Sequence, residues 1–174
     1  AAYVPYDTAY PRERLAAMFE DLKPKVVITS ERLTNRLPDP AIQRICLDGE
    51  AEAIARESRE KPAVHPEPEH LCYVIFTSGS TGRAKAAAVC HGGWNNLLNW
   101  FVHRFNIRPS DRTLVMSSIS FDITQRAMAM PLTSGGELHL VASDHYEPEL
   151  ILDTIAKEKI TVMNCAPSTF YPLV

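Results

Sequence analysis

A loop of small polar residues is the part of this 174-residue sequence best suited to chemistry. Its two glycines permit positive φ, so that successive backbone N–H groups can turn towards one anion. Four hydroxyl groups add hydrogen-bond donors, and Lys85, shortly after the loop, adds a mobile positive charge. The loop residues are Thr77, Ser78, Gly79, Ser80, Thr81 and Gly82. Together these groups predict a binding site for a polyphosphate.

The spacing of this loop differs from that of the P-loop NTPases. Their pattern needs Gly, four residues and then Gly-Lys-Ser/Thr, whereas Gly79 and Gly82 are only three apart and Lys85 is followed by Ala86. The structural alternative is a flexible Gly/Ser surface loop, with Lys85 as an ordinary exposed lysine. The run Tyr73–Phe76 argues against it, because linkers rarely follow directly on a buried strand.

A second group of candidates lies further along the chain. A helical pattern runs from about Asp122 to Leu132, so Asp122 and Arg126, four residues apart, share one helical face. Asn164 stands at the end of the last predicted strand. Each has a plainer interpretation: Asp122 as the N-cap of its helix, Arg126 as a solvated side chain, and Asn164 as a polar strand end.

The elements that position these residues alternate between helix and strand. Apolar residues at helical spacing predict helices near 11–22, 51–59, 91–105, 122–132 and 148–159. Short β-rich runs predict strands near 25–29, 44–48, 73–77, 113–116, 137–141 and 160–164. This alternation indicates an α/β fold with a mainly parallel sheet and flanking helices. The aromatic stripe Trp94, Phe101 and Phe105 is expected in the core.

In such a fold, ligands bind at the carboxyl ends of the strands. Three polar features follow strands here: the loop after Phe76, the segment from Ser117 to Asp122, and Asn164-Cys165. We therefore expect all three at one rim of a sheet.

Several of these motifs resemble those of one enzyme family. The Thr77–Gly82 loop is similar to the phosphate-binding loop of the adenylate-forming superfamily, which contains acyl-CoA synthetases, luciferases and the adenylation domains of nonribosomal peptide synthetases. The peptide synthetases fit best, because the first fifteen residues, Ala1–Leu15, resemble the segment that precedes the loop in their adenylation domains. Ser120-Phe-Asp122 and Asn164-Cys-Ala-Pro167 extend the resemblance over nearly the whole chain.

The resemblance implies a reaction and a role for each candidate. The enzyme would form an aminoacyl-AMP from ATP and an amino acid, and pass it to the phosphopantetheine thiol of a carrier domain. Thr77 and Lys85 would act on the leaving phosphates, which the loop residues hold and Mg²⁺ bridges. Asp122 would accept hydrogen bonds from the substrate α-ammonium. Arg126 and Asn164 would line the substrate pocket, where Arg126 could meet a polar or anionic side chain.

The sequence departs from the family pattern at two places. Ala84-Lys85-Ala86 stands where many members have Pro-Lys-Gly, and Cys90 stands where an acidic residue or Thr is usual before the His. Because of these departures, a degenerate, non-catalytic interaction module remains an alternative interpretation of the chain. Within the enzyme class, the alternative is an acyl-CoA or aryl-acid ligase.

Composition excludes other classes. The chain has 45% hydrophobic and 22% charged residues and a net charge of −3, which gives no reason to expect nucleic-acid or membrane binding. The four cysteines lack a CxxC or Cys/His cluster, so no protein-bound metal is expected and a cytoplasmic location is favoured. By resemblance, residues 1–174 form part of an adenylation domain, its large N-terminal subdomain, and the C-terminal part is missing. We expect this chain alone to be inactive.

Overall fold

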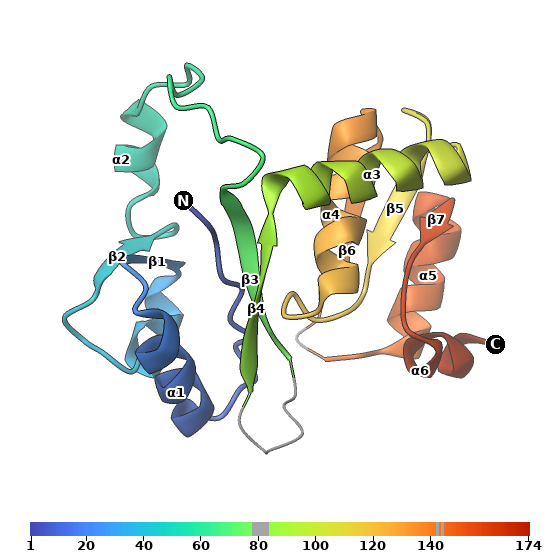
Figure 1. The fold of residues 1–174 in the computed structure, drawn as a ribbon. Coiled ribbons are helices and arrows are strands. Elements are labelled where there is room, and N and C mark those ends of the chain that lie inside the picture. The colour runs from blue at the N-terminus through green and yellow to red at the C-terminus, as the bar shows by residue number, and fades with distance from the viewer. Residues whose placement is uncertain (78–83, 142, 144) are drawn as a thin grey trace. The chain divides into compact units, whose positions relative to one another are not determined.

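The computed structural model describes residues 1–77, 84–141, 143 and 145–174 (Figure 1). The chain forms two compact units. One contains Ala1–Pro5, Pro66–Ile75 and Ala86–Val174, and the other contains Tyr6–His65 and Phe76–Lys85. The predicted α/β class is confirmed, because parallel strands alternate with helices along the chain.

The Tyr6–His65 unit combines two short parallel strands with helices. Its elements are α1 (Arg12–Leu22), β1 (Val26–Thr29), the 3₁₀-helix η1 (Glu31–Arg36), β2 (Gln43–Cys46) and α2 (Ala51–Arg56). β1 and β2 pair from Val26 with Gln43 to Thr29 with Cys46. Helix α1 buries its predicted apolar face through Leu15, Met18 and Phe19. It ends where Lys23 adopts a left-handed conformation, one residue before Pro24.

Two strands border the predicted phosphate loop, and each lies partly in each unit. These are β3 (Leu71–Thr77) and β4 (Lys85–Cys90), which form a two-stranded sheet. β3 buries every residue from Cys72 to Phe76, as its apolar sequence predicts. The N-terminal segment pairs with this strand: the N–H of Tyr3 donates to the carbonyl of Cys72 at 3.2 Å, and the N–H of Val74 to the carbonyl of Tyr3 at 3.0 Å.

The larger unit continues with helices around a three-stranded sheet. Its further elements are α3 (His91–Phe105), β5 (Arg112–Val115), α4 (Asp122–Ser134), β6 (Glu137–Leu140), α5 (Pro148–Glu158), β7 (Val162–Met163), α6 (Pro167–Phe170) and the 3₁₀-helix η2 (Tyr171–Leu173). The strand order is β6-β5-β7, and both pairings are parallel. The central strand β5 is the most buried, with Thr113 and Leu114 fully inaccessible.

A hydrophobic cluster holds this larger unit together. Its buried members come from β3, α3 and α4: Cys72, Tyr73, Ile75, Trp94, Leu98 and Met130. Phe101 is partly buried against the cluster. Helix α4 packs on both α3 and β5 (Figure 1), so the start of α4 is set by core packing on two sides.

A tight turn joins α4 to β6 at Gly135-Gly136. Gly135 has φ +79°, which a residue with a side chain rarely adopts. At Gly136, an added Cβ would lie 2.8 Å from the carbonyl oxygen of Asp111. The carbonyl of Asp111 also accepts a hydrogen bond from the N–H of Glu137 at 2.9 Å. The close approach of Gly136 to Asp111 therefore brings the first residue of β6 alongside the start of β5.

The structure corrects several predicted boundaries. Helix α2 ends at Arg56, not near residue 59. Helix α4 continues through Pro131 to Ser134, because burial of Met130 and Pro131 in the core outweighs the missing N–H. The last strand has only two residues, since it pairs only with Thr113 and Leu114.

The sheet arrangement and three short helices also differ from expectation. The described strands form three separate sheets, and β3 is not in the sheet of β5 and β7. Two short helices that were not predicted, α6 and η2, follow the last strand. Helix η1 was not predicted, since its charged sequence has no apolar period. Within the described residues, every helix is too short or too polar to cross a lipid bilayer.

Candidate functional site

Asp122 is the first residue of helix α4 but does not cap it. Phe121 occupies the N-cap position in an extended conformation, and no side chain caps the helix end. The carboxylate of Asp122 accepts the N–H of Ile123 at 2.7 Å. The side chain is exposed and lies at the N-terminal, positive end of the helix dipole. The N-cap interpretation is therefore wrong, and the carboxylate keeps acceptor capacity for a ligand.

Arg126 lies one turn further along α4 and is held on two sides. With the side-chain amide of Asn164 oriented so that its oxygen faces the guanidinium, Oδ1 accepts hydrogen bonds from Nε at 3.0 Å and Nη2 at 2.8 Å. The opposite orientation would set N–H groups against N–H groups. The guanidinium carbon also lies 4.0 Å from the centre of the Phe101 ring. Arg126 is thus half-buried and not a solvated side chain.

Charges in this region act on one another. Burial lowers the pKa of Arg126, while the Asp122 carboxylate and the Tyr73 hydroxyl raise it. Burial raises the pKa of Tyr73, and the negative charge of Asp122 raises it further. Asp122, Arg126 and Tyr73 therefore form one electrostatic group within the larger unit.

The segment before Asp122 is fixed by a buried amide. Gln125, only 1% exposed, donates from Nε2 to the carbonyl of Ile119 and accepts at Oε1 from the hydroxyl of Tyr3 at 2.8 Å. The hydroxyls of Ser118 and Ser120 lie 2.8 Å apart in the same segment. These contacts hold the chain between β5 and α4, so they also set where Asp122 stands.

Sequence reasoning missed four residues of this neighbourhood: Tyr3, Tyr73, Phe101 and Gln125. Phe101 was assigned to the core, and its place over Arg126 could not be read from helical spacing. Gln125 directly before Arg126 could have been recognised from the sequence as a possible buried amide. A buried amide needs several hydrogen-bond partners, so it would have indicated that other segments pack against the start of this helix. Nothing in the local sequence links Tyr3 to a residue 122 positions later.

The parallel strands bring two of the predicted rim features together. Met163 of β7 pairs with Leu114 of β5, so the segments that follow these two strands leave the same edge of one sheet. Asn164 comes directly after β7 and reaches Arg126 on α4. Asp122, Arg126 and Asn164 therefore belong to a single region, as the sequence predicts.

An open hollow adjoins Asn164. It has a volume of about 450 Å³, and its lining is mainly apolar. The lining residues are Met163, Asn164, Cys165, Pro167, Phe170 and Tyr171. Asp122 and Arg126 are not among them.

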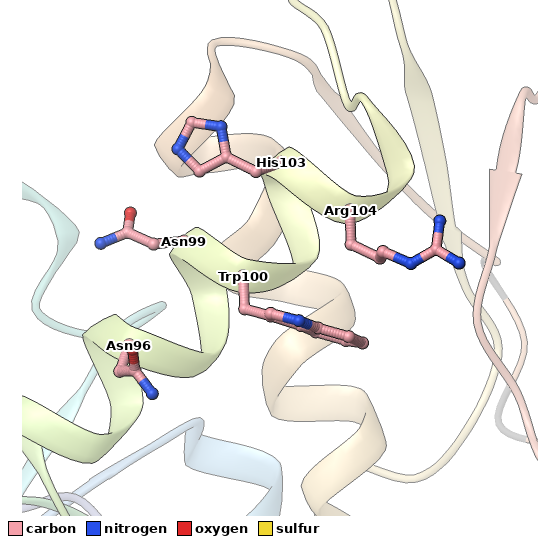
Figure 2. Close-up of a pocket in the computed structure, with 5 residues that line it drawn as sticks. All are labelled: Asn96, Asn99, Trp100, His103 and Arg104. Atoms are coloured by element: carbon pink, nitrogen blue, oxygen red, sulfur yellow. The ribbon is translucent and has the colours of Figure 1, made fainter.

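A second hollow, of about 510 Å³, lies along α3 (Figure 2). Figure 2 shows its lining on successive turns of that helix: Asn96, Asn99, Trp100, His103 and Arg104. No predicted site residue lines it, so it is separate from the group around Arg126.

The predicted phosphate loop is described only at its two ends. The hydroxyl of Thr77 donates to the carbonyl of Lys85 at 3.3 Å, and both residues are exposed. The structure therefore brings the first loop residue and the predicted lysine together. The predicted residues between them lie outside the described residues: Ser78, Gly79, Ser80, Thr81 and Gly82.

Comparison with known proteins gives consistent matches along the whole chain. Residues 1–174 match the family model described as AMP-binding enzyme. A linear gramicidin synthase from Brevibacillus parabrevis is 38% identical over 163 residues, which are 93% of this chain and 3% of that protein. The dimodular nonribosomal peptide synthase of Bacillus subtilis strain 168 is 34% identical over 178 residues, covering 100% of this chain and 8% of that protein.

A solved structure agrees with these relatives. The nonribosomal peptide synthetase FmoA3, in its form bound to α-methyl-L-serine-AMP, matches with a TM-score of 0.88 and 30% identity. The match covers 99% of this chain and 19% of that chain. The chain therefore spans only a small part of the length of the proteins it resembles.

Proposed function

The chain belongs to the AMP-binding enzyme family, and we propose that it is part of an adenylation domain that activates an amino acid for nonribosomal peptide synthesis. A substrate carboxylate oxygen attacks the α-phosphorus of ATP, the bond to the β-phosphate oxygen breaks, and pyrophosphate leaves. The product is an aminoacyl-AMP. A thiol then displaces AMP and carries the aminoacyl group as a thioester.

One observation carries this proposal: the exposed carboxylate of Asp122 lies one turn of α4 before the half-buried guanidinium of Arg126. A carboxylate that keeps free acceptor sites can bind the α-ammonium of an amino acid through charge-assisted hydrogen bonds. A fatty or aryl acid has no such group to offer. The relative FmoA3 is bound to an aminoacyl adenylate, which supports an amino acid as the substrate class.

The residues around the phosphate loop would act on the ATP. Lys85 would balance charge that develops on the leaving phosphates, and the hydroxyl of Thr77 would turn from the carbonyl of Lys85 to donate a hydrogen bond to a phosphate oxygen. The loop residues Ser78, Gly79, Ser80, Thr81 and Gly82 would supply further N–H and hydroxyl donors. Catalysis would then consist of positioning and electrostatic stabilisation, since no protein group forms a covalent bond to the substrate.

The residues present fit a Mg²⁺ ion that is held mainly by phosphate oxygens. In the described parts of the chain, no three His, Cys, Asp or Glu side chains gather into a metal site. Mg²⁺ in nucleotide sites keeps few protein ligands and binds substrate phosphates. When bound, the ion would neutralise part of the triphosphate charge, and Lys85 would add to that effect.

The proposed partners follow from the reaction. The aminoacyl group needs an acceptor thiol, which we assign to the phosphopantetheine of a carrier domain in the same assembly line, alongside other synthetase modules. One of the relatives that this chain matches is a dimodular nonribosomal peptide synthase. A relative built from more than one module supports the assignment of partner domains in the same assembly line. We place the protein in the cytoplasm and assign it no nucleic-acid or membrane partner.

Amino-acid-dependent ATP–pyrophosphate exchange by the complete protein tests the proposal. Exchange should require an amino acid and should not occur with acids that lack the α-amino group. Exchange that occurs with acids lacking the α-amino group, and not with amino acids, would favour an acyl-CoA or aryl-acid ligase. A non-catalytic module would be favoured by two results together. The protein would bind nucleotide but show no exchange under any condition, and Lys85→Ala would bind nucleotide as tightly as the wild type.

A further inference from the structure

We propose that one side of helix α3 is a docking surface for an acidic surface segment of another domain of the same synthetase chain. This side, called the α3 face below, consists of Asn96, Asn99, Trp100, His103 and Arg104. The inference rests on the proposed function only in that the chain is part of a longer synthetase. It does not depend on which substrate the enzyme takes.

The α3 face borders the open hollow of about 510 Å³, and all five of its side chains are exposed (Figure 2). Asn96, Trp100 and Arg104 follow one another at intervals of four residues, and Asn99 and His103 form the adjacent row. Residues at these intervals are neighbours on a helix surface. The buried residues of α3 lie on the opposite side of the helix, so the α3 face is not needed for the core.

Trp100 is the apolar centre of the α3 face. It is 52% exposed, yet its ring meets Phe101 edge-on at 5.0 Å and Phe105 edge-on at 6.1 Å. Phe101 packs against the hydrophobic cluster, so the indole is held in place before a partner binds. An ordered side chain loses little conformational entropy on binding. Trp and Arg are also enriched among the residues that dominate binding at protein interfaces.

The α3 face carries positive charge and no negative charge. From His91 to Ser110 the sequence contains no Asp or Glu, and its two arginines are Arg104 and Arg108. Among the described residues, Arg104 forms no ion pair. The whole chain has a net charge of −3, so this positive region is local. Charge complementarity therefore favours a partner with carboxylates, and the indole N–H of Trp100 offers them a further donor.

A second copy of this chain is a poor occupant of the α3 face. The commonest symmetric dimer places the same patch of both copies against itself. Such a dimer would bring Arg104 of each copy together without a carboxylate from α3 between them. Like charges that meet across an interface oppose binding.

The small size of the α3 face favours a partner on the same chain. At 1.5 Å per residue, Asn96 to Arg104 extend roughly 12 Å along the helix axis. A stable complex of separate proteins usually buries about 1,200–2,000 Å², far more than this face offers. A domain on the same chain is present at an effective concentration of about millimolar, so a small contact suffices. This chain covers only 3% and 8% of two relatives, whose remaining length can supply such a domain.

Photo-crosslinking in the complete protein tests the proposal. The photoreactive amino acid p-benzoylphenylalanine, placed at Asn99, lies within the α3 face. Crosslinks mapped by mass spectrometry should join residue 99 to a surface segment of the same chain that lies outside residues 1–174 and carries Asp or Glu. Arg104→Glu in the same protein should lower the yield of this crosslink about ten-fold, because it replaces an attraction by a repulsion.

Arg104 is the residue of choice for this substitution. Trp100 is left unchanged because its ring meets Phe101, which lies against Arg126. An exchange of the crosslinked carboxylate for Arg, combined with Arg104→Glu, should restore the crosslink. A structural effect of Arg104→Glu would not be reversed in this way.

Arg14 provides a matched control on the other unit. It is exposed, and its guanidinium lies over the ring of Tyr10 at 3.9 Å. Arg14→Glu makes the same charge change away from α3 and should leave the crosslink yield unchanged. An equal loss of crosslink in both variants would overturn the proposal, because it would show an effect of net charge alone.

Failure of this proposal can be told apart from failure of the proposed function. Arg104→Glu should keep amino-acid-dependent pyrophosphate exchange close to that of the wild type, which also shows that the variant folds. Crosslinks that are absent, that join two copies of the chain, or that keep their yield in Arg104→Glu would overturn the docking surface while exchange continues. Absence of exchange with every amino acid would instead contradict the proposed function.

Discussion

Asn164 accepts two hydrogen bonds from Arg126, at 3.0 Å to Nε and 2.8 Å to Nη2, which joins the residue after β7 to the second turn of α4. The two residues are 38 positions apart in the sequence. Their contact orients the guanidinium in the neighbourhood of Asp122. The predicted substrate residues are therefore mutually supported, and each can be tested separately.

Removal of the carboxylate at residue 122 should weaken amino-acid binding. Asp122→Asn keeps the shape and an acceptor oxygen for the N–H of Ile123 but loses the charge. The lost charge-assisted hydrogen bond corresponds to about 1.5–3 kcal/mol, or about 10–100-fold in KM for the amino acid. Pyrophosphate exchange at varied amino-acid concentration measures this. Asp153→Asn, an exposed aspartate on α5, is the control, and equal effects of both variants would argue against the assigned role.

Lys85 should act on ATP and not on the amino acid. Lys85→Ala removes the positive charge proposed to face the leaving phosphates, so kcat of exchange should fall about 10²-fold or more. The KM for the amino acid should stay close to that of the wild type. Lys61→Ala changes an exposed lysine outside every described helix and strand, and should have no effect. An amino-acid KM that rises with unchanged kcat would show that Lys85 has a different role.

The Tyr3–Gln125–Ile119 hydrogen bonds should stabilise the segment before Asp122. Gln125→Leu leaves the hydroxyl of Tyr3 and the carbonyl of Ile119 without their partner, at a cost of about 1–3 kcal/mol in stability. Tyr3→Phe alone should cost less, because Gln125 keeps its bond to Ile119. Urea-induced loss of activity measures both, and the double variant should be less destabilised than the sum of the single ones. Strict additivity would mean that the two side chains do not act together.

The hydroxyl of Tyr6 should make stability depend on pH in alkali. Burial raises the pKa of Tyr6 to about 12, from an ordinary 10.0, and among the described residues this buried hydroxyl has no hydrogen-bond partner. The unfolded chain therefore loses this proton first as pH rises. Stability from this group is full below about pH 10 and falls between about pH 10 and 12.

Tyr6→Phe provides the measurement. It should match or exceed the wild-type thermal midpoint at pH 9, because it removes an unpaired buried hydroxyl, and should gain further on the wild type at pH 11. Tyr171→Phe changes a tyrosine that is 70% exposed and serves as the control. A Tyr6→Phe protein that loses stability at pH 9 would show that the hydroxyl has a partner.

Much of the fold could be predicted because local patterns agree with tertiary packing. The apolar face of α1 and the buried run in β3 are visible in the sequence, and both are buried in the structure. The helical face shared by Asp122 and Arg126 follows from spacing alone. Boundaries failed where long-range packing decides, as at the C-terminal end of α4, where a helix with Met130 and Pro131 buried continues to Ser134 and not to about Leu132.

The surroundings of the site were harder to predict because they depend on contacts between distant segments. Phe101 belongs to a helical apolar stripe, and only packing of α3 against α4 places its ring over Arg126. Tyr3 reaches Gln125 only because the N-terminal segment pairs with β3. Neither contact has a local sequence pattern.

A structure of the complete protein with a non-hydrolysable aminoacyl-adenylate analogue tests the central claim most directly. The account predicts the α-ammonium nitrogen of the ligand about 2.7–3.0 Å from a carboxylate oxygen of Asp122. Lys85 and the loop that begins at Thr77 should face the phosphate end of the site. An ammonium group bound elsewhere, with the Asp122 carboxylate making no contact to the ligand, would contradict the account.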